Sequence, residues 1–328
     1  MNKVFGVTIR KGGQGKSTTV STVARLCALS GARVLVVDLA QPGTTTASLR
    51  DIWRPSDHTD LSEMLLSLRS LPAHTLPSIE QARAAFGASG LPVTLATQPS
   101  WAGGSVRILP WDEVLADAAS HPQSEFVLAG LVRALNDEID LTLIDFPAEG
   151  GPLYAMAMAA TESVIMPLTP ETPALEGAYS TLRSITQWKA RNHRIGLGGI
   201  ILTRCDPKNK RMFDVVQALL QTTEIEGERV SERLFPFGIR ANEFFEQAFR
   251  YGEAVWQRTA NPSHWAGYVL LAEWLLRRAG REDLAQASRR RGPALLTADT
   301  RILDVTGGVL ESPDIPYSDF ARTHPPAP

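Results

Sequence analysis

A stretch of eight residues near the N-terminus, Lys11–Thr18, has the composition of a phosphate-binding loop. It reads KGGQGKST, with three glycines between two lysines and two hydroxyl residues at its end. Glycines allow successive backbone N–H groups to turn inward around phosphate oxygens. Lys16 would add positive charge at the β- and γ-phosphates, and the Ser17 hydroxyl is placed to ligate Mg²⁺. The stretch therefore predicts a nucleotide site, and it leaves the role of Lys11 to be explained.

The loop departs from the general pattern Gly-x-x-x-x-Gly-Lys-Ser/Thr at the first glycine, where this chain has Arg10. The other residues keep the register, and the nucleotide ligands expected from them are Lys11, Gly12, Gly13, Gln14, Gly15, Lys16, Ser17 and Thr18. The alternative is a glycine-rich turn that binds nothing. We disfavour it because an apolar strand precedes the loop and a helix follows, with its positive dipole end toward the phosphates.

The segments around the loop have the pattern of a strand–helix–strand unit. Val4–Ile9 is a short apolar run typical of a buried parallel strand, and residues 16–29 have the apolar spacing of a helix closed by Gly31. A second apolar run over residues 32–38 ends at Asp38. Because these elements follow one another so closely, we expect a right-handed βαβ crossover.

The rest of the chain alternates between strand-like and helix-like segments. Strand-like runs cover residues 140–146, 163–168, 196–202 and 233–237, and the helical patterns include 125–137, 174–190, 210–221 and 266–280. Residues 51–122 are less regular, with a helical patch at 60–68 and a candidate strand at 93–97. The alternation predicts an α/β fold with a doubly wound, mostly parallel sheet flanked by helices. We expect one domain over residues 1–280, and over 281–328 a tail that is partly disordered or docks as a short hairpin.

Two aspartates lie at the ends of strand-like runs. Asp38 ends the second run, and Asp145 ends the run LTLID. Carboxylates at the carboxyl ends of adjacent parallel strands can face one crevice and organise Mg²⁺ with its waters. The sequence thus predicts a metal site formed by Ser17, Asp38 and Asp145. The alternative for each aspartate is a structural role in the turn that follows its strand.

Together these motifs resemble those of the ParA/MinD ATPases, P-loop proteins whose deviant Walker A loop carries a second lysine. The stretches VVDLAQPGTTTAS, LTLIDFPAEGG, VIMPLTPETPALEGAYSTL and RLFPFGIRANEFFEQAFRYGEAV are similar, in order and spacing, to segments of that family. The resemblance covers residues 4–280, is weakest in the middle, and is closer to ParA than to MinD. It implies an ATP-dependent homodimer with the nucleotides between the subunits. Lys11 would then reach the partner's phosphates as an arginine finger does, so the implied catalytic residues are Lys11, Lys16 and Asp38.

One position departs from the family pattern in a way that bears on catalysis. The family has a second aspartate two residues after the first, associated with positioning or activating the attacking water, and this chain has Ala40 there. A methyl group neither accepts a proton nor orients a water molecule. Asp38 and Gln41 are the alternative groups for this task. We therefore expect ATP and Mg²⁺ to bind, and hydrolysis to be slow or absent.

The resemblance also points to base and DNA contacts. Asp206 and Pro236 lie in segments that border the adenine in the family. ParA-type dimers bind DNA without sequence preference, and the candidate residues here are Arg240, Lys208, Lys210, Arg211 and Arg250, with Arg289–Arg291 in the tail. Ordinary turn chemistry and solvated surface charge are the alternatives. Phosphate contacts would give binding that weakens steeply with salt.

Composition narrows the remaining possibilities. A formal net charge of −2 and a pI near 6.3 do not favour nucleic-acid binding by the average surface, so a DNA site would be a local basic patch. Cys27 and Cys205 are the only cysteines, which excludes a disulfide framework and a cysteine-held iron–sulfur cluster between subunits. The sequence has neither a signal-peptide pattern nor an apolar run of membrane-spanning length, so we expect a cytoplasmic protein without membrane attachment.

Two functions compete at this level. The first is a plasmid or chromosome partition ATPase that coats nucleoid DNA and is released by a ParB-like partner. The second is an ATP-gated dimeric scaffold that recruits a secretion, polysaccharide-export or polar-positioning machine through a cargo adaptor and does not bind DNA. The match to ParA favours the first, whereas Ala40 and the weak basic charge favour the second. A P-loop kinase or ligase would need a substrate pocket that the sequence does not reveal.

Overall fold

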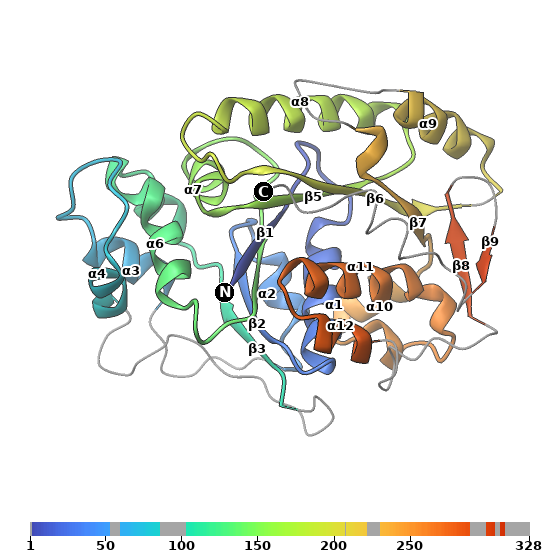
Figure 1. Cartoon of the computed structure of the whole chain (residues 1–328), viewed down its shortest axis with the longest axis horizontal. Helices are drawn as coiled ribbons and strands as arrows, with labels where there is room; N and C mark the ends of the chain where they lie inside the picture. Colours follow the sequence, from blue (N-terminus) through green and yellow to red (C-terminus); the bar gives the residue numbers. More distant parts are fainter. Residues whose placement is uncertain are drawn as a thin grey trace.

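The computed structural model describes residues 2–52, 60–85, 103–206, 208–221, 230–288, 300–305 and 309–311. Within these ranges one nine-stranded sheet runs through the molecule in the order β3-β2-β4-β1-β5-β6-β7-β8-β9 (Figure 1). The strands are β1 (Lys3–Val7), β2 (Arg33–Asp38), β3 (Ser105–Leu109), β4 (Leu141–Asp145), β5 (Ser163–Leu168), β6 (Gly196–Cys205), β7 (Leu234–Arg240), β8 (Arg301–Asp304) and β9 (Val309–Glu311). Strands β1 to β7 pair in parallel, and β8 and β9 are antiparallel at one edge. This arrangement confirms the doubly wound, mostly parallel α/β sheet.

Helices cover both faces of the sheet and enclose an apolar core on each (Figure 1). One face carries α1 (Lys16–Leu29), α10 (Phe244–Tyr251), α11 (Ala266–Arg278) and α12 (Glu282–Ser288). The other carries α3 (Leu61–Ser67), α4 (Ile79–Ala85), α5 (Leu115–Ala119), α6 (Val127–Ala134), α7 (Pro152–Ala160), α8 (Thr172–Trp188) and α9 (Lys210–Gln221). The short α2 (Thr44–Ser48) follows β2, and 3₁₀ helices occur at Pro122–Phe126, Ser231–Arg233, Val255–Gln257 and Pro262–His264. Burial from both sides explains why β2 and β4 are almost continuously apolar.

Most elements that the sequence predicts are present. The helices at residues 16–29 and 210–221 have the predicted bounds, and the four later strand-like runs correspond to β4, β5, β6 and β7. The irregular region supplies the edge strand β3, whereas the candidate strand at 93–97 lies outside the described residues. Periodicity does not predict α7, because this helix is apolar on almost every side and has no polar face to mark its turn.

The C-terminal part of the chain is joined to the domain at two places. The segment α12 packs against α11, and Arg281 just before it forms an ion pair with Asp140 at 2.5 Å. Further on, β8, which contains the apolar run around residue 302, pairs antiparallel with β7 and with β9. Residues 289–299, which include the basic run Arg289–Arg291, lie outside the described residues.

The apolar helix predicted near residue 270 is α11, which is buried along nearly its whole length. It packs against α1 and β7. In the part of the chain that the structure describes, α11 and the other helices are all too short or too polar to cross a membrane.

Candidate nucleotide site

A cleft of about 1010 Å³ opens at the carboxyl ends of the parallel strands, where the phosphate loop follows β1. Five groups of residues line it: the loop, the segment after β2, the ends of β4, β6 and β7, one face of α10, and Tyr268 of α11. Their members are Gly12, Gly13, Gln14, Gly15, Lys16, Ser17, Thr18, Ala40, Gln41, Thr44, Phe146, Ala148, Thr203, Arg204, Ile239, Arg240, Ala241, Asn242, Glu243, Phe245, Glu246, Phe249, Arg250 and Tyr268. This edge of a doubly wound sheet is where such folds bind their ligands.

The phosphate loop is held in shape by its glycines and by Gln14. Gly13 and Gly15 have φ angles of 75° and 83°, which side chains other than glycine rarely adopt. The Gln14 side-chain oxygen accepts hydrogen bonds from the backbone N–H and the hydroxyl of Thr169, at 2.9 and 2.8 Å. The Thr203 hydroxyl donates to the Gln14 carbonyl at 3.0 Å. Gln14 therefore braces the loop against the end of β5 through its side chain and against β6 through its backbone carbonyl.

The two lysines of the loop occupy different surroundings. Lys16 is buried at the start of α1, lines the cleft, and donates from Nζ to the Lys11 carbonyl at 3.3 Å. Lys11 is half-buried and does not line the cleft. Next to it, the Arg10 N–H donates to the Thr181 hydroxyl of α8 at 3.0 Å, which fixes the start of the loop. Only Lys16 is thus placed to meet a ligand in the cleft of its own chain.

Asp38 and Asp145 lie opposite each other in the register of β2 and β4, and both are fully buried. Both oxygens of Asp38 are already used: Oδ1 accepts from the Ala40 N–H at 3.1 Å, and Oδ2 accepts from the N–H and hydroxyl of Thr46, each at 2.7 Å. In Asp145, Oδ2 accepts from the Thr45 hydroxyl at 2.6 Å. Two adjacent threonines of α2 therefore hold the two carboxylates.

Burial and mutual repulsion set the electrostatics of this pair. Burial raises the pKa of Asp145 to about 7, and the neighbouring Asp38 carboxylate adds to this rise, whereas Ser17, Thr45 and Lys16 oppose it. Burial also raises the pKa of Asp38, against the hydrogen bonds from α2. The pKa of Lys16 is lowered by burial, with Asp145 opposing. A bound cation would relieve the repulsion between the two carboxylates.

The residues present fit a magnesium ion bound together with phosphates. Asp145 Oδ1 is buried and has no hydrogen-bond partner among the described residues, so a ligand position is available there. The Ser17 hydroxyl is close enough to lower the pKa of the same carboxyl. Within the described ranges, no group of three or more His, Cys, Asp or Glu residues could hold a metal alone, so phosphate oxygens would complete the set. The ion would neutralise charge on the phosphates, and Asp38, whose oxygens are occupied, would hold α2 in place.

Ala40 lies in the cleft wall, next to the predicted metal ligands. It is 8% exposed, and its N–H donates to Asp38. Gln41, which follows it, is exposed and also lines the cleft. An aspartate at position 40, as in the family pattern, would therefore lie in the same cleft as the phosphate loop. In this chain the position carries only the methyl group of alanine.

The two predicted base contacts, Asp206 and Pro236, do not line the cleft. Asp206 is exposed after β6, its carboxylate accepts from the Lys208 N–H at 2.9 Å, and neither it nor Pro236 lines the cleft. Near the ends of β6 and β7, the described residues that line the cleft are instead Arg204 and residues 239–243. Both Asp206 and Pro236 are thus placed as turn and strand residues, and they remain predictions as base contacts.

The predicted DNA-binding residues are not in one place. Arg240 and Arg250 line the cleft, from the end of β7 and from α10 respectively. Lys208 is exposed before α9, and that helix begins with Lys210 and Arg211. Two of the DNA candidates, Arg240 and Arg250, are therefore part of the ligand cleft.

Sequence reasoning missed the part of the site built by α10. Phe245, Glu246 and Phe249 all line the cleft from this helix, and Phe245 packs edge-on against Tyr268 of α11, with ring centroids 5.4 Å apart. The spacing of residues 245, 246 and 249 is that of one helical face. This spacing was readable in the sequence, but nothing local indicates that the face turns toward the phosphate loop.

A phosphate loop between a parallel strand and a helix, with acidic residues ending two neighbouring strands, defines a P-loop nucleotide-binding protein. A family model for the AAA domain matches residues 2–196. The chain belongs to the ParA/MinD family of P-loop ATPases. The chromosome-partitioning ATPase Soj of Thermus thermophilus is 29% identical over 281 residues, which cover 82% of this chain and 93% of the relative.

Solved structures with the same fold include apo McdA from Cyanothece, with a TM-score of 0.64 and 19% identity over 84% of this chain and all of the other. The septum site-determining protein MinD from Pyrococcus horikoshii, complexed with Mg-ADP, has a TM-score of 0.59 and 17% identity, covering 85% of this chain and 98% of the other. At this identity the two structures support the fold.

Proposed function

We propose that the protein is a ParA-like positioning ATPase that binds ATP with Mg²⁺ and forms a homodimer with the nucleotides between the subunits. One observation carries this proposal: Lys16, Ser17 and Ala40 line a single cleft beside the buried Asp145, whose carboxyl interacts with Ser17 and Lys16, while Lys11 of the same loop lies outside the cleft. Soj of Thermus thermophilus is a chromosome-partitioning ATPase, and MinD of Pyrococcus horikoshii forms a complex with Mg-ADP; both relatives support the proposal. Lys11 is then free to reach a nucleotide in a partner subunit.

Hydrolysis is proposed to be slow because position 40 has no group that can accept a proton. Ala40→Asp is expected to raise the steady-state rate of phosphate release by about 100-fold, the lower range of a well-placed general base. Ala40→Asn is the matched control, since it has the same size and cannot accept a proton at neutral pH. The proposal fails if wild-type protein with saturating ATP already turns over as fast as Ala40→Asp.

Partition by non-specific DNA binding is the first form of this function, and the test is binding to mixed-sequence duplex DNA. We expect binding with ATP, none with ADP, and a steep loss of affinity between 50 and 200 mM salt, because phosphate contacts release counterions, with loss of roughly 10³-fold for six contacts. Removing Lys208, Lys210 and Arg211 together by alanine substitution should abolish it, whereas ATP-dependent dimerisation should persist.

A dimeric scaffold without DNA binding is the second candidate, and the placement of two arginines favours it. Arg240 and Arg250 line the cleft, so fewer cations remain for a separate DNA surface than the sequence suggests. Light scattering in the same buffers discriminates the two functions. ATP-dependent dimers with no DNA affinity at 50 mM salt would leave the scaffold as the function.

A further inference from the structure

The helices α2 and α10 both border the cleft, and they also contact each other. The first residue of α2, Thr44, lines the cleft, and so does one face of α10. The two helices are in contact, and hydrogen bonds link their C-terminal ends. Any occupant of the cleft that extends from the phosphate loop to α10 therefore touches both helices.

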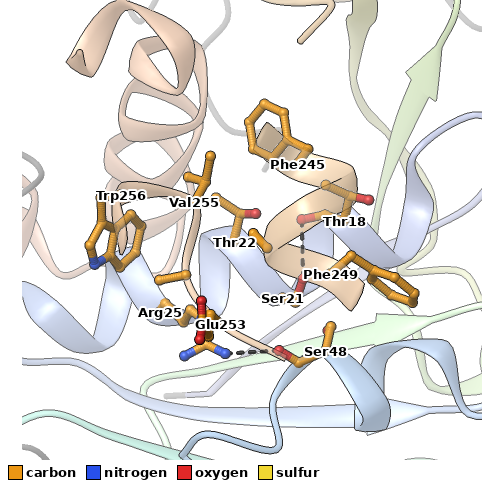
Figure 2. Close-up of a pocket in the computed structure, with 12 residues that line it drawn as sticks. Thr18, Ser21, Thr22, Arg25, Ser48, Phe245, Phe249, Glu253, Val255 and Trp256 are labelled. Carbon is orange, nitrogen blue, oxygen red and sulfur yellow. Dashed lines mark hydrogen bonds between the residues drawn. The ribbon is translucent and has the colours of Figure 1, made fainter. Parts of the chain in front are cut away.

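The junction between these helices is built around the guanidinium of Arg25, a residue of α1 whose side chain is 4% exposed. Its Nη2 donates to the Ser48 carbonyl of α2 at 2.8 Å and to the Gly252 carbonyl, just after α10, at 3.4 Å. Nη1 and Nη2 also donate to the two carboxylate oxygens of Asp51, at 3.1 and 2.5 Å. Figure 2 shows Arg25 reaching Ser48 beneath α1, with Phe245 and Phe249 on the neighbouring helix.

The chemistry of the junction suits a cation that holds two helix ends at once. The last carbonyls of a helix have no partner within it and carry partial negative charge. One buried guanidinium meets such carbonyls from both helices, and its planar fork pairs with a carboxylate at the same time. If either helix moved relative to the other, the hydrogen bonds that Arg25 donates to Ser48 and Gly252 could not all be kept.

Two further contacts tie the same ends. The Asp51 N–H donates to the Gly252 carbonyl at 3.2 Å, and Arg50 Nη2 donates to the Arg250 carbonyl at 2.8 Å. Gly252 has a φ of 66°, and a Cβ at this position would lie 3.0 Å from the Ala47 carbonyl oxygen. The close approach of the chain after α10 to α2 therefore depends on glycine.

A small cavity lies beside the Arg25 junction, and Arg25 and Ser48 are among the residues that line it. This cavity of about 10 Å³ lies among Thr18, Ser21, Thr22 and the two phenylalanines Phe245 and Phe249 (Figure 2). This volume is at the lower limit for a water molecule. The hydrogen bonds of Arg25 therefore join α10 to α2 next to a gap in the packing.

At its N-terminal end α2 holds both acidic residues of the site. The Thr45 hydroxyl donates to Asp145 and Thr46 donates twice to Asp38. The Ser48 hydroxyl in turn donates to the Thr45 carbonyl at 2.8 Å, so the two ends of this five-residue helix are linked. Whatever fixes the C-terminal end of α2 also fixes the two carboxylates.

We propose that Arg25 is a positioning residue that couples occupancy of the α10 side of the cleft to the placement of Asp38 and Asp145 through α2. The proposal rests on the proposed nucleotide-binding function of the cleft. Inorganic tripolyphosphate with Mg²⁺ fills the loop but lacks the nucleoside that would reach α10. Mg²⁺-ATP therefore orders α2 more than Mg²⁺-tripolyphosphate does, and this difference passes through Arg25.

The test is hydrogen–deuterium exchange of the full chain without ligand, with Mg²⁺-tripolyphosphate and with Mg²⁺-ATP. In wild-type protein we expect ATP to slow exchange over residues 44–52 about 10-fold more than tripolyphosphate does. In Arg25→Met, ATP should still slow exchange over residues 11–18, while the two ligands should have equal effects over 44–52. Arg25→Lys, whose single nitrogen cannot reach all three acceptors, should keep an intermediate difference.

The matched control is Arg107→Met in β3, where another largely buried arginine, 14% exposed, pairs with Glu138 at 3.5 Å away from the cleft. It should keep the wild-type difference between the two ligands. The proposal is overturned if Arg25→Met keeps the wild-type difference between ATP and tripolyphosphate in exchange over residues 44–52. If that variant does not fold, a difference in Arg25→Lys as large as in wild-type protein overturns it. If ATP fails to slow exchange over residues 11–18 of wild-type protein, the nucleotide site itself is wrong and the coupling falls with it.

Discussion

Asp145→Asn is expected to stabilise the protein in the absence of Mg²⁺, and to do so more at pH 8 than at pH 5. Burial and Asp38 raise the pKa of Asp145 from 3.8 to about 7. A carboxyl whose pKa is higher in the folded state favours folding at low pH, and this advantage is lost as pH rises toward 7. At about 1.4 kcal/mol per pKa unit, asparagine should raise the free energy of unfolding by roughly 2–4 kcal/mol at pH 8.

The measurement is urea unfolding in EDTA at both pH values. The gain at pH 5 should be smaller by about 2 kcal/mol, because wild-type Asp145 is then largely protonated in the folded protein. Asp117→Asn in α5 changes an exposed aspartate and should give no pH-dependent gain. Equal stability of wild-type and Asp145→Asn at pH 8 would mean that the buried pair carries no electrostatic cost.

The two loop lysines are expected to fail in different ways when each is replaced by alanine. Lys16 is buried in the cleft, and losing one member of a buried charged contact costs about 2–5 kcal/mol. Lys16→Ala should therefore weaken ATP binding by about 100-fold or more. The Lys11→Ala monomer should bind ATP with nearly the affinity of the wild-type monomer. Its affinity for a second subunit in the presence of ATP should fall by about 10-fold or more.

Calorimetry with a non-hydrolysed ATP analogue and light scattering with ATP or ADP measure the two effects separately. Arg10→Ala is a useful companion, since Arg10 is exposed beside Lys11 and its change keeps both loop lysines. Lys11→Ala protein that dimerises with wild-type affinity would remove the role across the interface. Lys16→Ala protein that keeps its ATP affinity would place the nucleotide somewhere other than this cleft.

Much of the fold follows from local patterns. Apolar runs bounded by turn residues located β1, β2 and β4 to β7, and helical spacing located α1, α8, α9 and α11. Their alternation was enough to predict a parallel doubly wound sheet, because parallel strands need helical crossovers. Local patterns do not predict the edge strand β3, because it lies in an irregular region. They also do not predict the helix α7, because it has no polar face.

The core of the site was also legible in the sequence. Glycine and lysine spacing located the loop, strand-end position located Asp38 and Asp145, and comparison with the family pattern exposed Ala40. These features are local, because a phosphate loop and a strand end are set by a few neighbouring residues. Asp38 and Asp145 come together simply because β2 and β4 are neighbouring strands whose register places the two residues side by side.

The partners of those residues needed the tertiary structure. Three features depend on contacts between distant segments. Thr46 donates hydrogen bonds to Asp38, α10 forms a wall of the cleft, and Arg25 joins α2 to the end of α10. The same is true of Arg240, a DNA candidate by resemblance that shares the cleft. The sequence alone determined which chemical groups the protein carries and the order of its elements. Packing of helices against the sheet decided which of those groups meet, because a side chain's neighbours across the core are not encoded in the residues beside it.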